Sequence, residues 1–150
     1  MKKFVFLAIV FLLFATSFAF ELNSGVLYSF SGQLLYALEF NTLSNLVNGP
    51  STTSGFSLMY ITDVAEKHFG AIGGQAKYDI NLEIGRISLY GFGGMLFPIF
   101  EFGFEKITSI VRVGAKYYIG NIIINSGIYS LYLIDSTKLE GVEFSIGYTF

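Results

Sequence analysis

The sequence predicts an all-β chain whose antiparallel strands, about eight in number, follow one another up and down and close into a barrel. Three observations support this fold class. Apolar and polar residues alternate over long segments, glycine-containing turns separate several of these segments, and the two prolines, Pro50 and Pro98, fall in expected connections. Proline is disfavoured inside a strand because it cannot donate a backbone hydrogen bond to the neighbouring strand.

The N-terminus is typical of a secretory signal peptide. Lys2 and Lys3 precede an uninterrupted apolar run at 4–15, and small residues precede a cleavage position after Ala19. The apolar run is too short for a transmembrane helix, and an uncleaved inner-membrane anchor remains the alternative. Because the chain has no cysteine, a lipoprotein signal is excluded. We therefore expect a signal peptide at 1–19 and a single barrel domain at 20–150.

Composition leaves two classes of protein open. The 150 residues include 53% hydrophobic and 13% charged residues, with 9 Lys+Arg against 11 Asp+Glu. This balance excludes the basic surface of a nucleic-acid-binding protein. After the N-terminus no run of about 20 apolar residues occurs, so no helix is expected to span a membrane. The chain is therefore either a soluble β-protein with a large core or a transmembrane β-barrel.

Alternation with a period of two is clearest at 74–84, 111–119 and 142–150. In the first segment Tyr78 and Ile80 share one face, whereas Lys77 and Asp79 share the other. A helix would distribute these residues around its circumference, so a strand explains the pattern better. The expected strands are 22–30, 33–41, 54–62, 72–84, 87–96, 108–119, 122–133 and 140–150. Eight strands of about 11 residues with connections of about five residues match the chain length after the signal peptide.

The connections support this order of strands. Gly85-Arg86 and Gly120-Asn121 each lie between isoleucines, as a two-residue hairpin turn with positive φ at glycine requires. With both termini on the periplasmic side, these short turns are periplasmic, and the longer links that carry Asp63 or Glu105 are external. Two links fit poorly: a turn of only Ser31-Gly32, and a long periplasmic link at 42–53.

Alternation does not say which face points into the barrel, but three features favour charged residues inside. The polar faces carry both signs of charge, which can pair in a narrow lumen, and they include small residues such as Gly114 and Gly147 that suit a crowded interior. Aromatic residues gather near strand ends, as they do at membrane interfaces. The expected interior charge network consists of Lys77, Asp79, Glu83, Arg112, Lys116 and Glu143.

A soluble periplasmic or secreted barrel of lipocalin-like form is the alternative. Such a barrel points its apolar residues inward and binds an apolar ligand. In that case Tyr78, Val113 and Ile146 would pack together in a central core, and Lys77 and Arg112 would be exposed to water.

The last nine residues suggest a family. The chain ends on an aromatic residue after alternating apolar positions, which resembles the C-terminal signature of bacterial outer-membrane β-barrels. With the signal and hairpins, the chain is similar to small eight-stranded barrels of the OmpX/OmpA membrane-domain type. The resemblance implies a location in the bacterial outer membrane, contact with outer-membrane lipid, and recognition by the barrel-assembly machinery during biogenesis. The residues of this C-terminal assembly signal are Phe144, Ile146, Tyr148 and Phe150.

No catalytic, cofactor or metal site is expected. The chain has one histidine, His68, and no cysteine, which makes a transition-metal site improbable. A resemblance to lipid A deacylase barrels would require a serine two residues after the histidine. This chain has Gly70 at that position. We therefore expect a non-enzymatic barrel with a structural or interaction role and at most a narrow pore, and a lipid-modifying enzyme is a third alternative. The aromatic segment at 97–104 is a candidate external surface for an unknown partner.

Overall fold

The computed structural model describes residues 19–49, 51–100, 103–133 and 135–150, with the backbone alone at 19 and 43–49. The expected signal peptide lies outside these residues except for Ala19, whose backbone pairs with Leu43 at the start of the first strand. Within the described ranges, no helix has the length and apolar character needed to cross a membrane.

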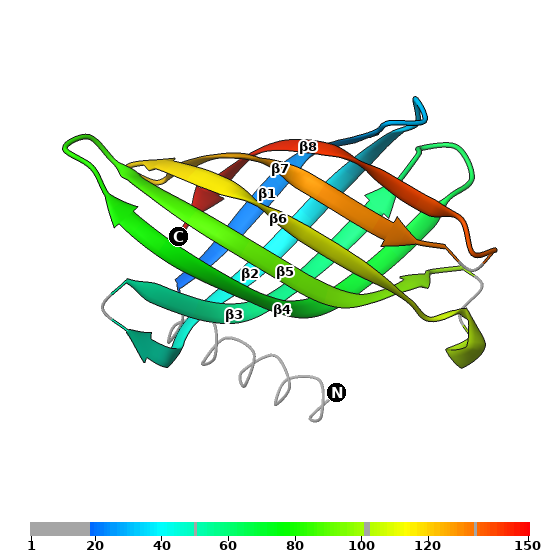
Figure 1. Ribbon diagram of the computed structural model, residues 1–150, viewed down its shortest axis with the longest axis horizontal. Coiled ribbons are helices and arrows are strands. Elements are labelled where there is room, and N and C mark those ends of the chain that lie inside the picture. Colours follow the sequence, from blue (N-terminus) through cyan, green and yellow to red (C-terminus); the bar gives the residue numbers. More distant parts are fainter. Residues whose placement is uncertain (1–18, 50, 101–102, 134) are drawn as a thin grey trace, which may run out of the picture.

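The chain forms one closed antiparallel barrel in which each strand pairs with the next and the last pairs with the first (Figure 1). Closure is made by nine consecutive residue pairs of the first and last strands, for example Gly25 opposite Ser145. One short 3₁₀ helix, η1 (Phe104–Lys106), lies between the fifth and sixth strands. The strands are β1 (Ala19–Ser29), β2 (Leu34–Gly49), β3 (Thr52–Thr62), β4 (His68–Asn81), β5 (Arg86–Pro98), β6 (Thr108–Ile119), β7 (Ile122–Tyr132) and β8 (Lys138–Thr149).

The links divide the barrel into two different ends. We call the end that holds the C-terminus and the start of β1 the terminal end, and the opposite one the loop end (Figure 1). The links at the terminal end are short, as the sequence predicts for a periplasmic side. The terminal-end links are 50–51, 82–85 and 120–121, and the loop-end links are 30–33, 63–67, 99–107 and 133–137.

One predicted turn is confirmed and three predicted links are wrong. Ile119 pairs with Ile122, so Gly120-Asn121 is a two-residue turn, with a φ of 59° at Gly120. The Gly85-Arg86 turn is instead a four-residue link at 82–85, because Asn81 pairs with Arg86 and Leu82 N–H donates to Gly85 O at 3.1 Å.

The other two corrections concern β1 and β2. The first link is longer than Ser31-Gly32, because Ser29 N–H donates to Gln33 O across it at 2.8 Å. The long link expected at 42–53 does not exist: β2 continues through 42–49 and pairs with β3, with an irregular register between Ser44 and Gly49. This bulge explains why the alternation is lost there.

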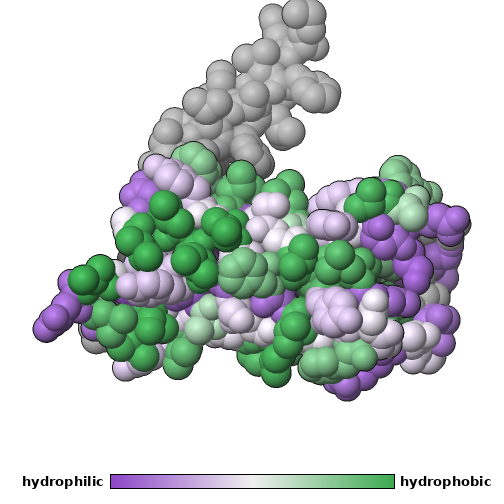
Figure 2. Space-filling model, turned by 90° about the horizontal axis from the view of Figure 1, so that it is seen from above, coloured by the Kyte–Doolittle hydropathy of each residue, from purple (hydrophilic) through white to green (hydrophobic). Residues whose placement is uncertain are grey.

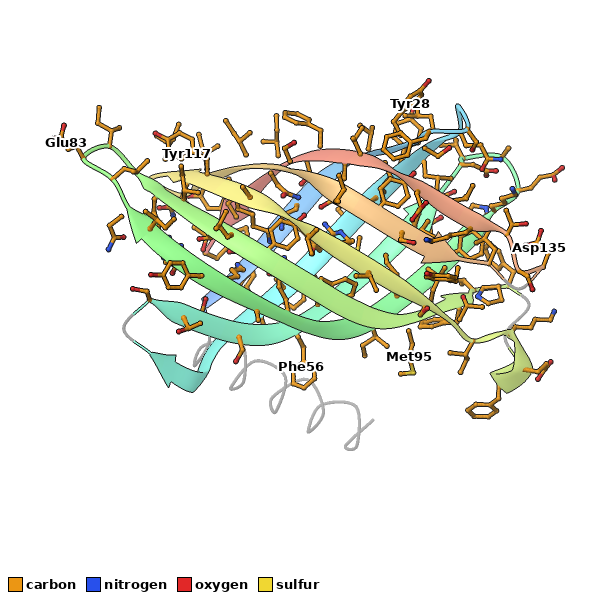
Figure 3. All side chains as sticks on the ribbon, in the orientation of Figure 1. Tyr28, Phe56, Glu83, Met95, Tyr117 and Asp135 are labelled. Carbon is orange, nitrogen blue, oxygen red and sulfur yellow. The ribbon has the colours of Figure 1, made fainter. Side chains whose placement is uncertain are left out.

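The wall of the barrel is apolar on the outside. Tyr78, Val113 and Ile146 are 53%, 46% and 55% exposed, so they do not form a central core. Figure 2 shows hydrophobic residues across the middle of the wall and hydrophilic residues toward the ends, and labelled side chains such as Phe56 and Met95 point away from the barrel in Figure 3. The lipocalin-like alternative predicts the reverse orientation and does not fit this structure.

Candidate functional site

The interior of the barrel is the candidate site because buried charged side chains meet there. Every second residue of a strand points inward. When the polar residues of a strand occupy these alternate positions, all of them therefore point into the lumen. Lys77 of β4, Arg112 and Lys116 of β6 and Glu143 of β8 are each at most 4% exposed. The structure therefore brings together four of the six residues expected in the interior network.

Two further carboxylates, Glu21 of β1 and Glu39 of β2, complete this group of charges. The sequence analysis missed both, although each shows the same alternation: Glu21 precedes the outward Leu22, and Glu39 lies between the outward Leu38 and the half-buried Phe40. Both lie on the first two strands, whose expected links at 31–32 and 42–53 fit the barrel poorly.

Glu21 is the centre of the first ionic cluster, toward the terminal end. One of its oxygens lies 2.5 Å from Lys77 Nζ, and the other lies 2.9 Å from Lys116 Nζ. The Tyr118 hydroxyl donates to the same carboxylate at 2.5 Å, and the Asn41 amide donates to it at 3.3 Å. One carboxylate thus pairs with two lysines, because each of its oxygens contacts a different ammonium group.

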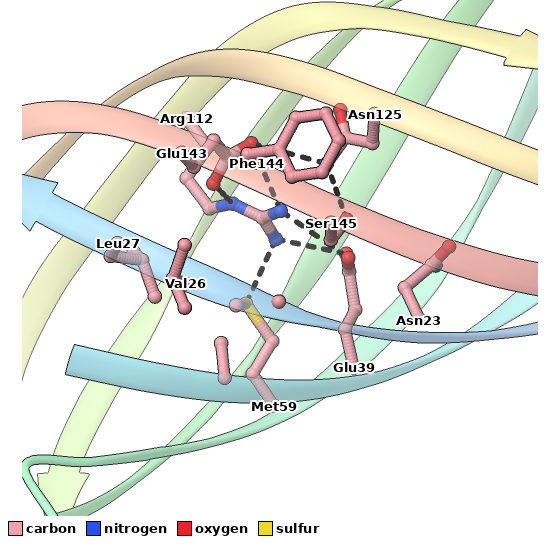
Figure 4. Close-up of a pocket in the computed structure, with 12 residues that line it drawn as sticks. Asn23, Val26, Leu27, Glu39, Met59, Arg112, Asn125, Glu143, Phe144 and Ser145 are labelled. Carbon is pink, nitrogen blue, oxygen red and sulfur yellow. Dashed lines mark hydrogen bonds and ion pairs between the residues drawn. The ribbon is translucent and has the colours of Figure 1, made fainter.

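Arg112 is the centre of the second cluster, near the middle of the barrel (Figure 4). Its Nη1 lies 2.9 Å from Glu39 Oε1, and its Nε lies 2.6 Å from Glu143 Oε2. The Tyr90 hydroxyl donates to Glu143, and the Ser57 hydroxyl donates to Glu39 at 3.1 Å. The planar guanidinium serves two carboxylates at once, which a lysine at this position could not do with the same geometry.

The two clusters are neutral in sum. The charged side chains classed as buried in the described part of the chain are three carboxylates and three cations, and each has an ionic partner. Burial of a charge is costly unless the charge is paired and hydrogen-bonded. The complete pairing therefore makes a filled, charged lumen compatible with a stable barrel.

The remaining two residues of the expected network are placed differently. Asp79 is half-buried near the terminal end, where it accepts a hydrogen bond from Ser88 Oγ at 2.5 Å and pairs with Arg86 at 3.3 Å. Glu83 does not face the lumen: it is exposed at the tip of the β4–β5 link (Figure 3). The expectation failed for Glu83 because β4 ends at Asn81, so the alternation no longer determines where the side chain points.

Little free space remains beside Arg112. A cavity of about 10 Å³ lies beside the Arg112 cluster, with Asn23, Glu39, Asn125 and Glu143 among its lining residues. A volume of this size holds about one water molecule. This cavity is too small for a solute.

His68 lies outside the lumen, at the loop end. Its Nδ1 is 2.7 Å from the Tyr60 hydroxyl and 3.1 Å from Thr62 Oγ1, and its ring contacts Phe100 edge-on at 5.0 Å between centroids. These contacts are those of an aromatic cluster on the outer surface. Among the described residues, no three His, Asp or Glu side chains are grouped so that they could hold a metal ion.

The residues of the expected assembly signal all lie on the outward face at the end of the chain. Phe144, Ile146 and Tyr148 alternate with inward Glu143 and Ser145 along β8, and Phe150 follows the strand. They belong to the apolar wall, and Phe144 also lines the cavity beside Arg112.

The barrel has the fold of solved transmembrane and outer-membrane barrels. It is similar to a de novo designed transmembrane β-barrel, with a TM-score of 0.59 and 14% identity over 88% of this chain and 95% of that one. It is also similar to the N-terminal β-barrel domain of OprF from Pseudomonas aeruginosa, with a TM-score of 0.55 and 14% identity over 88% of this chain and 97% of that domain. No family model and no curated protein matches the sequence. The expected fold class, a closed up-and-down barrel of eight antiparallel strands, is confirmed.

Proposed function

We propose that this chain is a bacterial outer-membrane protein that spans the bilayer as a closed barrel and has a structural or interaction role without an open pore. The apolar outer wall and the complete closure support the membrane location. In hydrocarbon each unpaired backbone N–H or C=O costs several kcal/mol, so a sheet can span a membrane only when it has no edge. The short links at the terminal end fit the periplasmic side.

The paired interior charges are the main observation that supports a barrel without an open pore. The charged side chains of the Glu21 and Arg112 clusters extend from five strands into the lumen and leave a cavity of only about 10 Å³ beside Arg112. An ion would have to separate these buried pairs, which is costly because each charge would lose its ionic partner. We therefore expect the barrel to conduct ions poorly or not at all.

Conductance in planar lipid bilayers tests this role. The purified, folded protein should give no large, steady open channel at any voltage that the bilayer tolerates. A porin of known conductance in the same bilayers controls for insertion. A large, steady conductance that scales with protein concentration would contradict the proposal.

Membrane fractionation with a heat-modifiability gel tests the location. The protein should appear in the outer-membrane fraction and should migrate differently before and after boiling, because a closed barrel resists unfolding by detergent alone. Recovery in the soluble periplasmic fraction would reject the membrane assignment and leave only the fold.

The loop end supports the interaction part of the role. Phe100 and Phe104 are 78% and 82% exposed, and Phe30 and Val64 are also exposed there. Exposed apolar groups of this size favour contact with a partner or with the outer leaflet. The double change Phe100→Ser and Phe104→Ser should leave the barrel heat-modifiable and should weaken retention of the nanodisc-embedded protein on a phenyl-substituted matrix. Unchanged retention would remove the loop from the proposed surface.

We also propose that the chain is not an enzyme and that the C-terminal residues act during assembly. Gly70 stands where a deacylase-like arrangement would need a serine, which supports the first point.

Deletion of Phe150 should slow the appearance of the heat-modifiable form in cells while leaving folding in detergent unchanged. Equal assembly of both forms in cells would contradict a role in recognition.

A further inference from the structure

The inward side chains change character along the barrel axis. On β1 the polar Glu21 and Asn23 lie near the terminal end, and Leu27 lies toward the loop end. β8 runs the opposite way and shows the reverse order, with Leu139 before Glu143. The lumen is therefore mainly polar in its terminal half and mainly apolar in its loop half, with buried Ile123 and Ser29 as exceptions at the two ends.

The apolar half is a continuous cluster to which all eight strands contribute. Leu35, Ile61, Leu96, Ile110 and Leu131 are each at most 1% exposed, which means that the layer is filled and closed to solvent. Apolar constrictions block ions and water because hydration is unfavourable there. We call this cluster the apolar layer; its members are Leu27, Leu35, Met59, Ile61, Ala71, Phe92, Leu96, Ile110, Tyr129, Leu131 and Leu139.

The polar half has unused hydrogen-bonding capacity. Four amide side chains, Asn23, Asn41, Gln75 and Asn125, are at most 4% exposed, and each has at least one polar atom without a partner. For Asn23 both amide atoms lack a partner, and no dashed line reaches this side chain in Figure 4. The Tyr129 hydroxyl, which belongs to the apolar layer, is the one such atom in that layer. A buried polar atom that makes no hydrogen bond costs about 1–3 kcal/mol.

The small cavity beside Arg112 lies where two of these four amides, Asn23 and Asn125, lack partners. Asn23 and Asn125 line it together with Glu39, Arg112 and Glu143, and its volume of about 10 Å³ admits one water molecule. Buried waters occupy polar sites of this kind and make about three hydrogen bonds each, whereas cavities lined by apolar groups stay empty.

We propose that ordered water molecules occupy the terminal half of the lumen, bound by Asn23, Asn41, Gln75 and Asn125, and that the apolar layer is the barrier that stops this water from crossing. The barrel is thus wet on its periplasmic side and dry on its external side. The proposal rests on the proposed function only in assuming that the barrel spans a membrane. The ionic clusters exclude ions, and the apolar layer excludes water.

Water contacts in the native protein test the two halves directly. NMR of the protein in detergent or nanodiscs should show magnetisation transfer from water to the side-chain amides of Asn23, Asn41, Gln75 and Asn125. The methyl groups of Leu35, Ile61 and Ile110 should show none. Absence of transfer to all four amides would overturn the hydrated half, and transfer to the methyl groups would overturn the dry barrier.

Osmotic water flow into proteoliposomes tests which layer is the barrier. The triple change Leu96→Ser, Ile110→Ser and Leu131→Ser should raise water permeability several-fold over the wild-type protein. The matched outward changes Val111→Ser, Val113→Ser and Ile128→Ser should not raise it, and heat modifiability shows that each variant is folded. A folded inward variant with wild-type permeability would overturn the barrier. This result is distinct from failure of the proposed function, which would appear as ion conductance or a soluble location of the wild-type protein.

Discussion

At the scale of single residues, Arg112 illustrates how much depends on charge pairing. The change Arg112→Met leaves Glu39 and Glu143 buried near each other without a cation, and such a loss costs about 3–5 kcal/mol. Adding Glu39→Gln and Glu143→Gln removes the uncompensated charges and should recover most of this loss. Urea unfolding of the single and triple variants in the same detergent measures both effects. Equal stability of the two variants would mean that the carboxylates are hydrated rather than paired.

Glu21 and Glu83 form a matched pair for a second prediction at this scale. Glu21→Gln leaves Lys77 and Lys116 close together without a carboxylate between them, so we expect a loss of about 3–5 kcal/mol in the free energy of unfolding. Glu83→Gln changes the same chemical group at an exposed position and should have no measurable effect. The shift in the midpoint of urea unfolding measures both effects. A larger shift for Glu83→Gln than for Glu21→Gln would contradict the placement of Glu21 inside the barrel and Glu83 outside it.

The placement of Glu21 and Glu39 could have been predicted from sequence, whereas their partners could not. Alternation fixes the parity of each residue and hence the face on which it lies. Which cation a carboxylate meets depends on strand tilt and closure, so Glu21 of β1 reaches Lys77 of β4 and Lys116 of β6 across the lumen. No local pattern in the sequence encodes that contact.

At the scale of elements, the β3–β4 link is held by hydrogen bonds to one titratable carboxylate, that of Asp63. The Asp63 carboxylate accepts backbone hydrogen bonds from Ala65, Glu66 and Lys67 at 2.9–3.0 Å, and that from Lys67 is the largest cause that holds the pKa of Asp63 below its ordinary value of 3.8. Because the pKa of Asp63 is lower in the folded link than in the unfolded chain, the ionised carboxylate stabilises the link at any pH above the unfolded pKa. This stabilisation is lost as the pH falls through the folded pKa.

Acidification should therefore loosen the 63–67 link. Hydrogen exchange of the amides of residues 65–67 should lose protection in strong acid, relative to the chemical exchange rate at each pH. In Asp63→Asn the side-chain oxygen still accepts hydrogen bonds but does not titrate, so protection should not depend on pH. The same loss in both proteins would place the pH dependence elsewhere.

The orientation of β6 gives a second prediction at the element scale. Val113 lies at mid-strand on the outer face, and Ile119 is the last residue of the same strand. A lysine on the lipid-facing side costs about 2–4 kcal/mol at the bilayer midplane and about 0–1 kcal/mol near an interface. Val113→Lys should therefore destabilise the barrel in lipid vesicles far more than Ile119→Lys. Equal effects, measured by reversible unfolding in vesicles, would contradict the membrane-spanning orientation.

The link between β4 and β5 shows why the pattern of a strand leaves its end undetermined. Ile87 was expected opposite Ile84 but pairs with Ile80, which lies on the same face. Either register keeps Ile80, Ile84 and Ile87 on the same face and keeps Gly85 free for its φ of 83°. Alternation therefore specifies faces, and the hydrogen bond from Leu82 to Gly85 decides the length of the turn.

At the scale of the whole molecule, the apolar layer marks where alternation stops being informative. Near the loop end both faces of a strand are apolar, as in Leu58, Met59, Tyr60 and Ile61 of β3. When an inward residue and its outward neighbours are all apolar, the sequence no longer alternates between apolar and polar residues. The pattern then does not show which residues face the lumen. Such runs occur at the same end of several strands, and only the antiparallel order of the closed barrel shows that they form one layer.

Closure itself is a property of the whole molecule that depends on glycine at the seam between β1 and β8. A Cβ added at Gly147 would collide with the Asn23 side chain and with the Leu22 carbonyl oxygen 2.6 Å away, and Gly25 faces the backbone of β8 equally closely. A valine at position 147 would therefore hold the first and last strands apart. In hydrocarbon the freed edges cost several kcal/mol for each unpaired backbone group.

Gly147→Val should accordingly lose the heat-modifiable form, whereas Gly74→Val should retain it. Gly74 lies on the outer face of β4, where an added Cβ meets no atom within 4 Å. Both changes place the same β-branched side chain in a strand, so differences in strand propensity cancel between them. If Gly147→Val folds as completely as Gly74→Val on the gel, the seam is wide enough to admit side chains. In that case the close approach of the two strands is not what closes the barrel.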